Sequence, residues 1–349
     1  MKVRFIWLMS VIALAVGSSG VNVIGQSGTA EAKKHIAAAQ TAAMQDHAWM
    51  YNRLCVEALG GVNAPPAPAP PAAAPAGPPA RATWHAEPLK VFDNVYWLGQ
   101  TEYSAWAIVT SDGIILMDAI YDYSVRDEVI EGMKKVGLNP ASIKYAIMGH
   151  WHGDHSAGAK TLQELYSTKI IMGPADWDAV EKTNPTWKPK KDIVATDGMK
   201  VTLGDTTVTV YITPGHTAGT LSSIIPVKDG GKPHVAAYWG GTMFNWIGRT
   251  TGGPLTRRPY DEYEGKPESF WFKQYADGAA RFKDIAAKAG ADVLMSNHTA
   301  FDGSKFKMPQ LALRKPGDAF HPYVIGKDSV QRYLTVTGEC ARAGSLIAK

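Results

Sequence analysis

Short apolar or alternating runs, broken by turn-forming residues, recur along the chain from residue 84 onward. Runs of four to eight residues with this pattern are typical of β-strands. The sequence therefore predicts strands in the first half over 94–99, 105–110, 113–118, 143–150 and 168–173. In the second half it predicts them over 207–213, 221–227, 234–240 and 291–296.

Helical spacing of apolar residues alternates with these runs. It predicts a helix over 126–136, a helix over 156–166 with Ser156 as its N-cap, a helix over 174–182 and a long helix over 267–289. Two strand-rich halves with helices on their outer faces favour a layered α/β or α+β sandwich, because each sheet must bury an apolar face against another element.

The first 83 residues have a different character. Lys2 and Arg4 precede a largely apolar run, 5–16, which falls short of the roughly 20 residues that span a bilayer. This pattern is typical of a secretory signal, predicted over 1–32, with an uncleaved N-terminal anchor as the alternative. A helical segment over 33–63 and a Pro/Ala-rich linker over 64–83 follow, and the main domain is expected over 84–349. The helical segment either docks on that domain or forms a loose stalk.

Composition narrows the class of protein. Hydrophobic residues make up 45% of the 349 positions, which is typical of a globular chain. The formal net charge of +4 is small and no long Lys/Arg run is present, so a nucleic-acid partner is not expected. After removal of the signal no stable membrane span is expected, and the location is predicted to be periplasmic or secreted.

Two cysteines, Cys55 and Cys340, lie 285 positions apart in the sequence. In an exported protein an even number of cysteines suggests one disulfide, and two unrelated free thiols are the alternative. Neither cysteine lies near a histidine cluster, so neither is expected to bind a metal.

The sequence GHWHGDHSAG, residues 149–158, concentrates His150, His152, Asp154 and His155 in one short turn after a predicted strand. In an extended backbone His150 and His152 point the same way, and Gly153 lets the chain turn so that Asp154 and His155 face a second point nearby. Imidazole and carboxylate groups are zinc ligands, so this turn can supply two ligands to each of two metals.

Two further histidines occupy sharp turns at predicted strand ends. His216 lies in TPGHTAG and His298 lies in SNHTAFDG. A catalytic zinc takes three protein ligands and leaves one position open, so these residues complete two sets of three. The remaining histidines are expected to be ordinary surface residues: His35, His47, His85, His234 and His321. Five tryptophans are expected in the core: Trp106, Trp151, Trp239, Trp246 and Trp271.

The motif HWHGDH resembles the H-x-H-x-D-H signature of the metallo-β-lactamase fold, and the resemblance extends over about residues 91–301. It implies an αββα four-layer sandwich with the site at one edge. The third subclass of metallo-β-lactamases is the most similar. That subclass implies two zinc ions per chain, one on His150, His152 and His216, the other on Asp154, His155 and His298. Asp118, at a predicted strand end, is expected to accept a hydrogen bond that fixes the turn.

The resemblance implies a zinc-dependent hydrolase that attacks an activated carbonyl of a small molecule with a hydroxide, which Asp154 helps to orient. A β-lactamase is the first expectation, and a lactonase or esterase on the same dinuclear fold is the alternative. A metal-binding or docking protein without turnover is a third possibility, opposed by the full ligand set.

One segment departs from the family pattern. Many thioesterases and lactonases of this fold carry a metal-bridging aspartate in a GDTLF-like segment, where this chain has GGTMF with Gly241. The third subclass has serines that hold the substrate here, where this chain has Gly241 and Met243. The adjoining loop, 245–259, is expected to flank the site, and its Arg249, Arg257 and Arg258 either attract an acidic substrate or are simply solvated.

Overall fold

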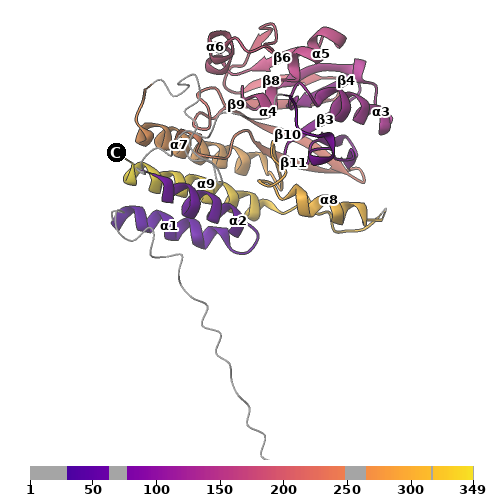
Figure 1. Ribbon diagram of the computed structural model, residues 1–349. Coiled ribbons are helices and arrows are strands. Elements are labelled where there is room, and N and C mark those ends of the chain that lie inside the picture. Colours follow the sequence, from indigo (N-terminus) through magenta and orange to yellow (C-terminus); the bar gives the residue numbers. More distant parts are fainter. Residues whose placement is uncertain (1–29, 63–76, 248–264, 316, 349) are drawn as a thin grey trace, which may run out of the picture.

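The computed structural model describes residues 30–62, 77–247, 265–315 and 317–348. The predicted signal up to residue 29, most of the predicted linker and the arginines of the 245–259 loop lie outside these residues. Within them, two sheets stack face to face with helices outside each sheet (Figure 1), so the predicted αββα sandwich is confirmed.

The first sheet has seven strands in sequential order, and β4 to β7 run parallel. Its strands are β1 Leu89–Phe92, β2 Val95–Gly99, β3 Ser104–Thr110, β4 Gly113–Met117, β5 Ile143–Ile147, β6 Lys169–Met172 and β7 Ile193–Val194. The second sheet has the order β12-β11-β10-β9-β8, with β11 and β12 parallel. Its strands are β8 Met199–Leu203, β9 Thr206–Ile212, β10 Leu221–Asp229, β11 Lys232–Trp239 and β12 Val293–Ser296.

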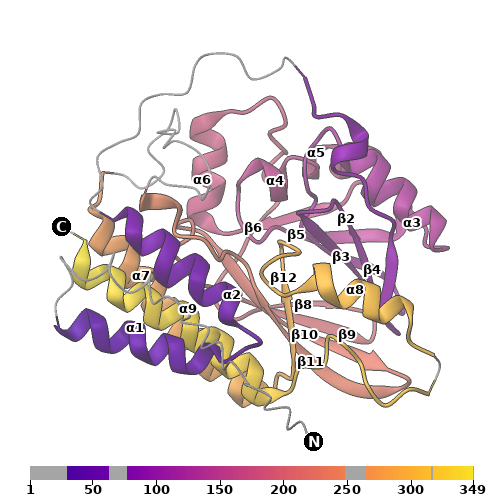
Figure 2. The same cartoon turned by 60° about the horizontal axis from the view of Figure 1, so that its bottom comes forward.

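Helices cover the outer face of each sheet (Figures 1 and 2). The first sheet is covered by η4 Arg126–Glu131, α3 Gly132–Lys135, α5 Ala159–Tyr166 and α6 Pro174–Thr183. The second sheet is covered by α7 Glu268–Ala289 and α9 Lys327–Ile347, and α8 Ser304–Ala312 follows β12. The 21-residue helix α9 is absent from the sequence prediction.

Strand alternation explains how these layers are held together. In β3, Trp106 points between the sheets, whereas its neighbours Ala105 and Ala107 face the helices of the first layer. In β11, Tyr238 likewise points between the sheets and Trp239 faces α7. Successive strand residues point to opposite faces, so strands buried on both sides need apolar residues at nearly every position. All five tryptophans expected in the core are buried.

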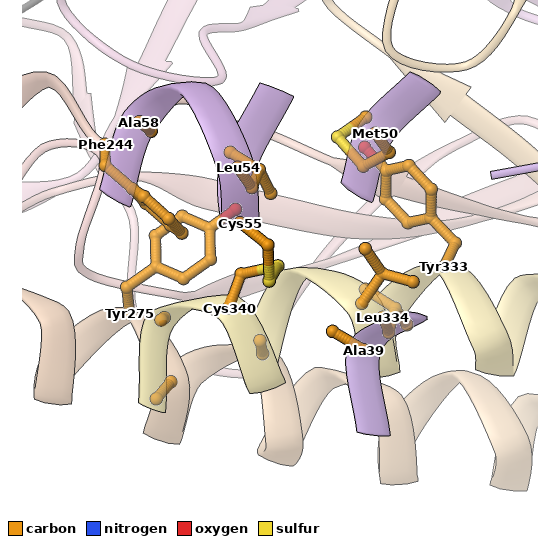
Figure 3. Close-up of a cluster of buried hydrophobic side chains, with 14 of the residues drawn as sticks. Ala39, Met50, Leu54, Cys55, Ala58, Phe244, Tyr275, Tyr333, Leu334 and Cys340 are labelled. Atoms are coloured by element: carbon orange, nitrogen blue, oxygen red, sulfur yellow. A yellow bond between two sulfur atoms is a disulfide. The ribbon is translucent and has the colours of Figure 1, made fainter. Parts of the chain in front are cut away.

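The N-terminal segment docks on the main domain and adds a further helical layer outside α9. It consists of α1 Ala30–Ala43, α2 Ala48–Tyr51, η1 Asn52–Ala58 and η2 Leu59–Gly61. Cys55 forms a disulfide with Cys340 of α9, and around it Leu54 and Ala58 pack in one apolar cluster with Phe244 and Tyr275 (Figure 3). The docked alternative is therefore confirmed, and the stalk is excluded.

Polar contacts tie the same segment to α9. Arg332 contacts both carboxylate oxygens of Asp46 at 2.6 Å, and Ser329 donates a hydrogen bond to Asp46 at 2.6 Å. Accordingly, the pKa of Asp46 is lowered: burial acts in the opposite direction, and the hydrogen bonds from Arg332 and Ser329 overcome it. No helix in the described part of the chain is long and apolar enough to cross a membrane.

Two expectations about individual residues are wrong. Ser156 does not cap a helix: the short helix α4, Gly153–Ser156, already begins at Gly153, and Ser156 donates its hydroxyl to the carbonyl oxygens of Trp151 and His152. Three of the histidines assigned to the surface, His47, His234 and His321, are buried and hydrogen-bonded. Long-range packing covers them, and a single sequence does not reveal such packing.

Removing the disulfide is expected to destabilise the protein strongly. The Cys55→Ser/Cys340→Ser double variant should lose about 3–5 kcal/mol of unfolding free energy, because a cross-link over a long loop restricts the unfolded chain. Urea denaturation with and without dithiothreitol measures this loss, and the double variant should not respond to the reductant. Equal stability of the oxidised wild type and the variant would contradict the prediction.

Candidate metal centre

The site lies where several strands end at the same rim of the sandwich. Asp118 follows β4, the 150–155 turn follows β5, and His298 follows β12. Because the carboxyl ends of parallel strands meet at one edge, β4 and β5 bring Asp118 next to the turn. His216 arrives from the turn after β9. The structure thus brings together all six side chains that the sequence predicts as metal ligands.

Three histidines form the first group. One ring nitrogen of His150, of His152 and of His216 lies within 4.8 Å of the other two. The Nε2 atoms of His150 and His216 are 3.1 Å apart. The backbone at His152 is extended (φ −58°, ψ 149°) and α4 begins at Gly153, which turns the chain after the second histidine as the sequence suggested.

Backbone carbonyls fix the orientation of two of these rings. His150 donates from Nδ1 to the Gly240 carbonyl oxygen at 2.8 Å, and His216 donates from Nδ1 to the Met243 carbonyl oxygen at 2.7 Å. A carbonyl oxygen only accepts, so both rings carry their proton on Nδ1 and direct an Nε2 lone pair into the site. Two lone pairs facing each other at 3.1 Å repel unless a cation lies between them.

The spacing of these nitrogens fits zinc. Tetrahedral zinc binds imidazole at about 2.0–2.1 Å, which places two ligand nitrogens about 3.3 Å apart. The observed separation of 3.1 Å is close to that value. Metal-binding histidines usually donate the N–H of the other ring nitrogen to a carbonyl or carboxylate oxygen, as His150 and His216 do here. The donor set therefore fits a bound metal ion.

Asp154, His155 and His298 form the second group. His155 Nε2 lies 3.1 Å from His298 Nε2 and 3.2 Å from Asp154 Oδ2, and His298 Nε2 lies 3.7 Å from the same carboxylate oxygen. One ring nitrogen of His150 also lies within 4.8 Å of a ligand atom of Asp154 and of His155. The two groups are therefore adjacent, as a dinuclear site requires.

The electrostatics of the cluster favour a cation. Burial lowers the pKa of His150, and the neighbouring His216 lowers it further. Burial, followed by the effect of His155, lowers the pKa of His298 to about 3. His155 differs: burial opposes its charged form, but Asp154 and Asp118 outweigh burial and raise its pKa to about 10. His150 and His298 are thus neutral and offer lone pairs to a metal, whereas His155 can bind one only after it releases the proton that Asp154 and Asp118 stabilise.

Asp118 occupies the position expected for a residue that fixes the turn. Its buried carboxylate accepts hydrogen bonds from the Gly149 backbone N–H at 2.6 Å and from the Tyr238 hydroxyl at 2.8 Å. His155 Nδ1 lies 3.1 Å from its second oxygen. One side chain thus holds both the beginning of the turn and one ring of the second group.

Two supporting residues were missed by the sequence analysis. Buried Asp176, in the first turn of α6, accepts hydrogen bonds from Trp151 N–H at 3.0 Å, Thr217 Oγ1 at 3.0 Å and Gly219 N–H at 2.9 Å. It therefore joins the 150–155 turn to the His216 turn. Asn297 donates to the Gly240 carbonyl that also orients His150. An acidic residue early in a helix and an asparagine beside His298 were the available signals, and neither is specific.

The chain is similar to known proteins both in sequence and in fold. Residues 98–229 match the metallo-beta-lactamase superfamily model. Among solved structures, the chain is similar to BJP-1, a subclass B3 metallo-beta-lactamase of Bradyrhizobium japonicum, with 26% identity and a TM-score of 0.59 over 74% of this chain and 92% of that one. Native FEZ-1 metallo-beta-lactamase from Legionella gormanii has 22% identity and a TM-score of 0.57, over 74% and 94% of the two chains.

Curated relatives share a shorter region. A hydroxyacylglutathione hydrolase of Neisseria meningitidis is 30% identical over 147 residues, which are 41% of this chain and 52% of the relative. One from Francisella philomiragia is 30% identical over 36% of this chain and 48% of its own. The chain spans about half the length of these relatives. Together with the fold and the His-rich cluster, the matches show that the chain contains a metallo-β-lactamase superfamily domain, matched over residues 98–229.

Proposed function

We propose that this protein is a zinc-dependent hydrolase that opens the amide bond of β-lactams. The convergence of the six side chains at the sheet rim carries the proposal. His150, His152 and His216 would hold one zinc ion, and Asp154, His155 and His298 would hold a second. Zinc bound there would supply a hydroxide at neutral pH and polarise the substrate carbonyl.

Residues of the chain itself would orient the water molecule and the imidazole ligands. The side chain of Asp154 is 21% exposed, so its carboxylate can accept a hydrogen bond from a water molecule at the opening and orient it. Asp118 and the carbonyls of Gly240 and Met243 hold the imidazoles in one orientation, which keeps their lone pairs aimed at one point. A preorganised site of this kind does not have to reorganise during the reaction.

The rim of the site supplies an apolar contact surface. The ring of Tyr103 lies 5.1 Å from that of His298 and 5.2 Å from that of Tyr121, between centroids. Both tyrosines are half-buried. Burial, followed by the charge of Asp154, raises the pKa of Tyr103, so its hydroxyl keeps its proton and can donate to a substrate. This surface suits a compact substrate with a hydrophobic side and polar edges.

Gly241 departs from the pattern of both candidate functions, because the aspartate of the thioesterases and lactonases and the serine of the third β-lactamase subclass each need a side chain there. A Cβ atom at 241 would lie 2.5 Å from the Cβ and 2.6 Å from the Cγ of His216, which real structures do not allow. Neither the bridging aspartate of the thioesterases and lactonases nor the serine of the third subclass therefore has room here. The hydroxyacylglutathione hydrolase relatives nevertheless keep a lactonase, esterase or thioesterase as the second candidate.

A substrate panel tests the proposal. We expect the zinc-loaded protein to hydrolyse at least one penicillin, cephalosporin or carbapenem with kcat/KM of at least about 10⁴ M⁻¹s⁻¹, the lower end for natural enzymes. Lactones, aryl esters and acylglutathione thioesters are assayed beside it. EDTA should abolish the activity and zinc should restore it, and this apo protein is the matched control. Turnover of a lactone or thioester with inert β-lactams would overturn the proposal in favour of the second candidate.

We further propose that the protein works outside the cytoplasm. A disulfide that ties the N-terminal segment to the C-terminal helix persists in oxidising compartments and is rare in the reducing cytosol. The basic and apolar start of the sequence supports the same location. Fractionation of cells that express the full chain tests it, since recovery in the cytosolic fraction alone would contradict export.

A further inference from the structure

A cavity of about 820 Å³ lies between α2 and η1 of the N-terminal segment, the turn after β12, and α8. None of the six candidate metal ligands is among the described residues that line it. Phe301 lies between the two sites, because its ring is 4.9 Å from that of His298 and 5.8 Å from that of Trp49, between centroids. Small-molecule sites typically enclose about 300–1,000 Å³, so this cavity is large enough for an organic ligand.

Aromatic side chains form the apolar part of this cavity. Trp49, Phe306 and Phe320 line it, and their exposed fractions are 42%, 76% and 66%. A group of exposed large apolar side chains marks a binding surface, whereas scattered single ones are ordinary. Arg53 lies 5.2 Å from the ring centre of Trp49 and pairs with Glu57 at 2.7 Å, which holds the indole in place. Walls made of rings suit a ligand with a flat aromatic body.

The charged side chains that line the cavity are mostly paired with one another or with their neighbours. Asp46 contacts Arg332, and Glu102 contacts Lys305. Lys307 is the exception, since its ammonium group forms no hydrogen bond or ion pair with any residue that the structure describes. The half-buried Lys307 therefore offers its N–H donors to a ligand in the cavity.

The surroundings of Lys307 fit a ligand with one negative charge. Its Nζ atom lies 5.0 Å from the Tyr323 ring centre, and burial lowers its pKa. The charge of Asp302 opposes this effect without forming an ion pair. The oxygens of that carboxylate accept hydrogen bonds from the backbone N–H groups of Ser296 and Ser304, at 3.0 and 2.9 Å. A bound anion would stabilise the ammonium form of Lys307, whereas Asp302 would repel a second negative charge.

We propose that this cavity binds a small aromatic carboxylate with a single negative charge. The aromatic body would pack against Trp49, Phe301 and Phe306, and the carboxylate would accept a hydrogen bond from the ammonium group of Lys307. The N-terminal segment supplies one wall, so the site exists only while that segment is docked, as the disulfide ensures. The site does not depend on the proposed hydrolase function, because it contains none of the candidate metal ligands.

Titration calorimetry with two matched probes tests the site. The compounds 2-naphthoate and 2-naphthamide have nearly the same shape, and only the first carries a charge. We expect one naphthoate to bind per chain, more tightly than the amide. Lys307→Met should weaken naphthoate binding at least about tenfold and leave the amide unchanged, because one charged hydrogen bond is lost. Trp49→Ala should weaken both probes about fivefold, because one aromatic wall is lost.

The matched control is Lys90→Met, which removes a lysine 5.8 Å from the ring centre of Tyr96, on β1 and outside the cavity. Both probes should bind this variant as they bind the wild type, and melting temperatures check that each variant is folded. In the zinc-loaded protein, 2-mercaptoethanol should not displace naphthoate, because a thiol binds the metal.

Three results would overturn the proposal. The first is a wild type that does not bind naphthoate, and the second is equal naphthoate affinity in the wild type and Lys307→Met. The third is displacement by 2-mercaptoethanol, which would place the probe at the metal centre. Binding to phosphatidylglycerol vesicles in place of free naphthoate would identify the exposed aromatic residues as a membrane contact instead.

Discussion

Replacing His152 by alanine is expected to abolish hydrolysis, with a fall in kcat/KM of at least about 1,000-fold. His152 is one of three imidazoles whose ring nitrogens lie within 4.8 Å of each other, and a catalytic zinc needs three protein ligands. Removing a residue that merely orients a metal ligand lowers metal affinity or activity by about 10–100-fold, so removing the ligand itself should lower activity further. Enzyme kinetics and elemental analysis of the purified variant measure both effects.

The control for this variant is another histidine outside the site. His35→Ala removes an imidazole that pairs with Glu339 on α9, and it should leave metal content and turnover unchanged. Zinc added in excess should restore only part of the His152→Ala activity, because the remaining two rings bind weakly. A His152→Ala protein with wild-type metal content and full activity would disprove the metal-dependent mechanism.

Replacing Asp118 by alanine should damage both stability and metal binding. Two buried donors, Gly149 N–H and the Tyr238 hydroxyl, would lose their acceptor, and an unsatisfied buried donor costs about 1–3 kcal/mol. We therefore expect a loss of about 3 kcal/mol in unfolding free energy. The ring of His155 would lose its orienting carboxylate, so metal affinity should also fall by about 10–100-fold.

Two companion variants separate these contributions. Asp118→Asn tolerates the left-handed backbone at this position (φ 59°) better than alanine and keeps one acceptor oxygen, so its loss of stability should be smaller. Tyr238→Phe removes one donor to the Asp118 oxygen that faces His155 but keeps the carboxylate itself, so it should cost stability and lower metal affinity less than Asp118→Ala does. Urea denaturation and zinc titration with a competing chelator provide the measurements. Wild-type metal affinity in Asp118→Ala would show that the carboxylate does not orient His155.

Local patterns in the sequence predicted nine of the twelve described strands, all except β1, β7 and β8, and the composition of the candidate site. Nearly continuous apolar runs along β3 and β11 reflect strands buried on both faces, and helical spacing over 268–289 reflects one apolar stripe against the second sheet. The turn of residues 150–155 carries four candidate ligands within six positions, so their proximity follows from chain geometry alone. His216 and His298 could be added because they follow predicted strands, whose ends lie at a common rim.

Features that depend on contacts between distant segments could not be predicted from local patterns in the sequence. Helix α9 received no prediction, and Ser156 was assigned to a cap although its hydroxyl bonds to the carbonyls of the preceding turn. Asp176 accepts hydrogen bonds from Trp151, 25 positions before it, and from Thr217, 41 positions after it, and nothing in its neighbourhood in the sequence indicates either partner. The burial of His47, His234 and His321 was missed for the same reason, because the elements that cover them come from remote parts of the chain.

The sequence by itself determined that this protein is a layered α/β chain with a turn rich in metal-binding side chains, because strand period, helix period and ligand spacing are local properties. Only the tertiary structure decided that Cys55 meets Cys340, that the Gly240 and Met243 carbonyls fix the imidazole tautomers, and that Gly241 leaves no space for a side chain. Those three facts are distances between segments far apart in the chain, and such distances are set by how the layers pack.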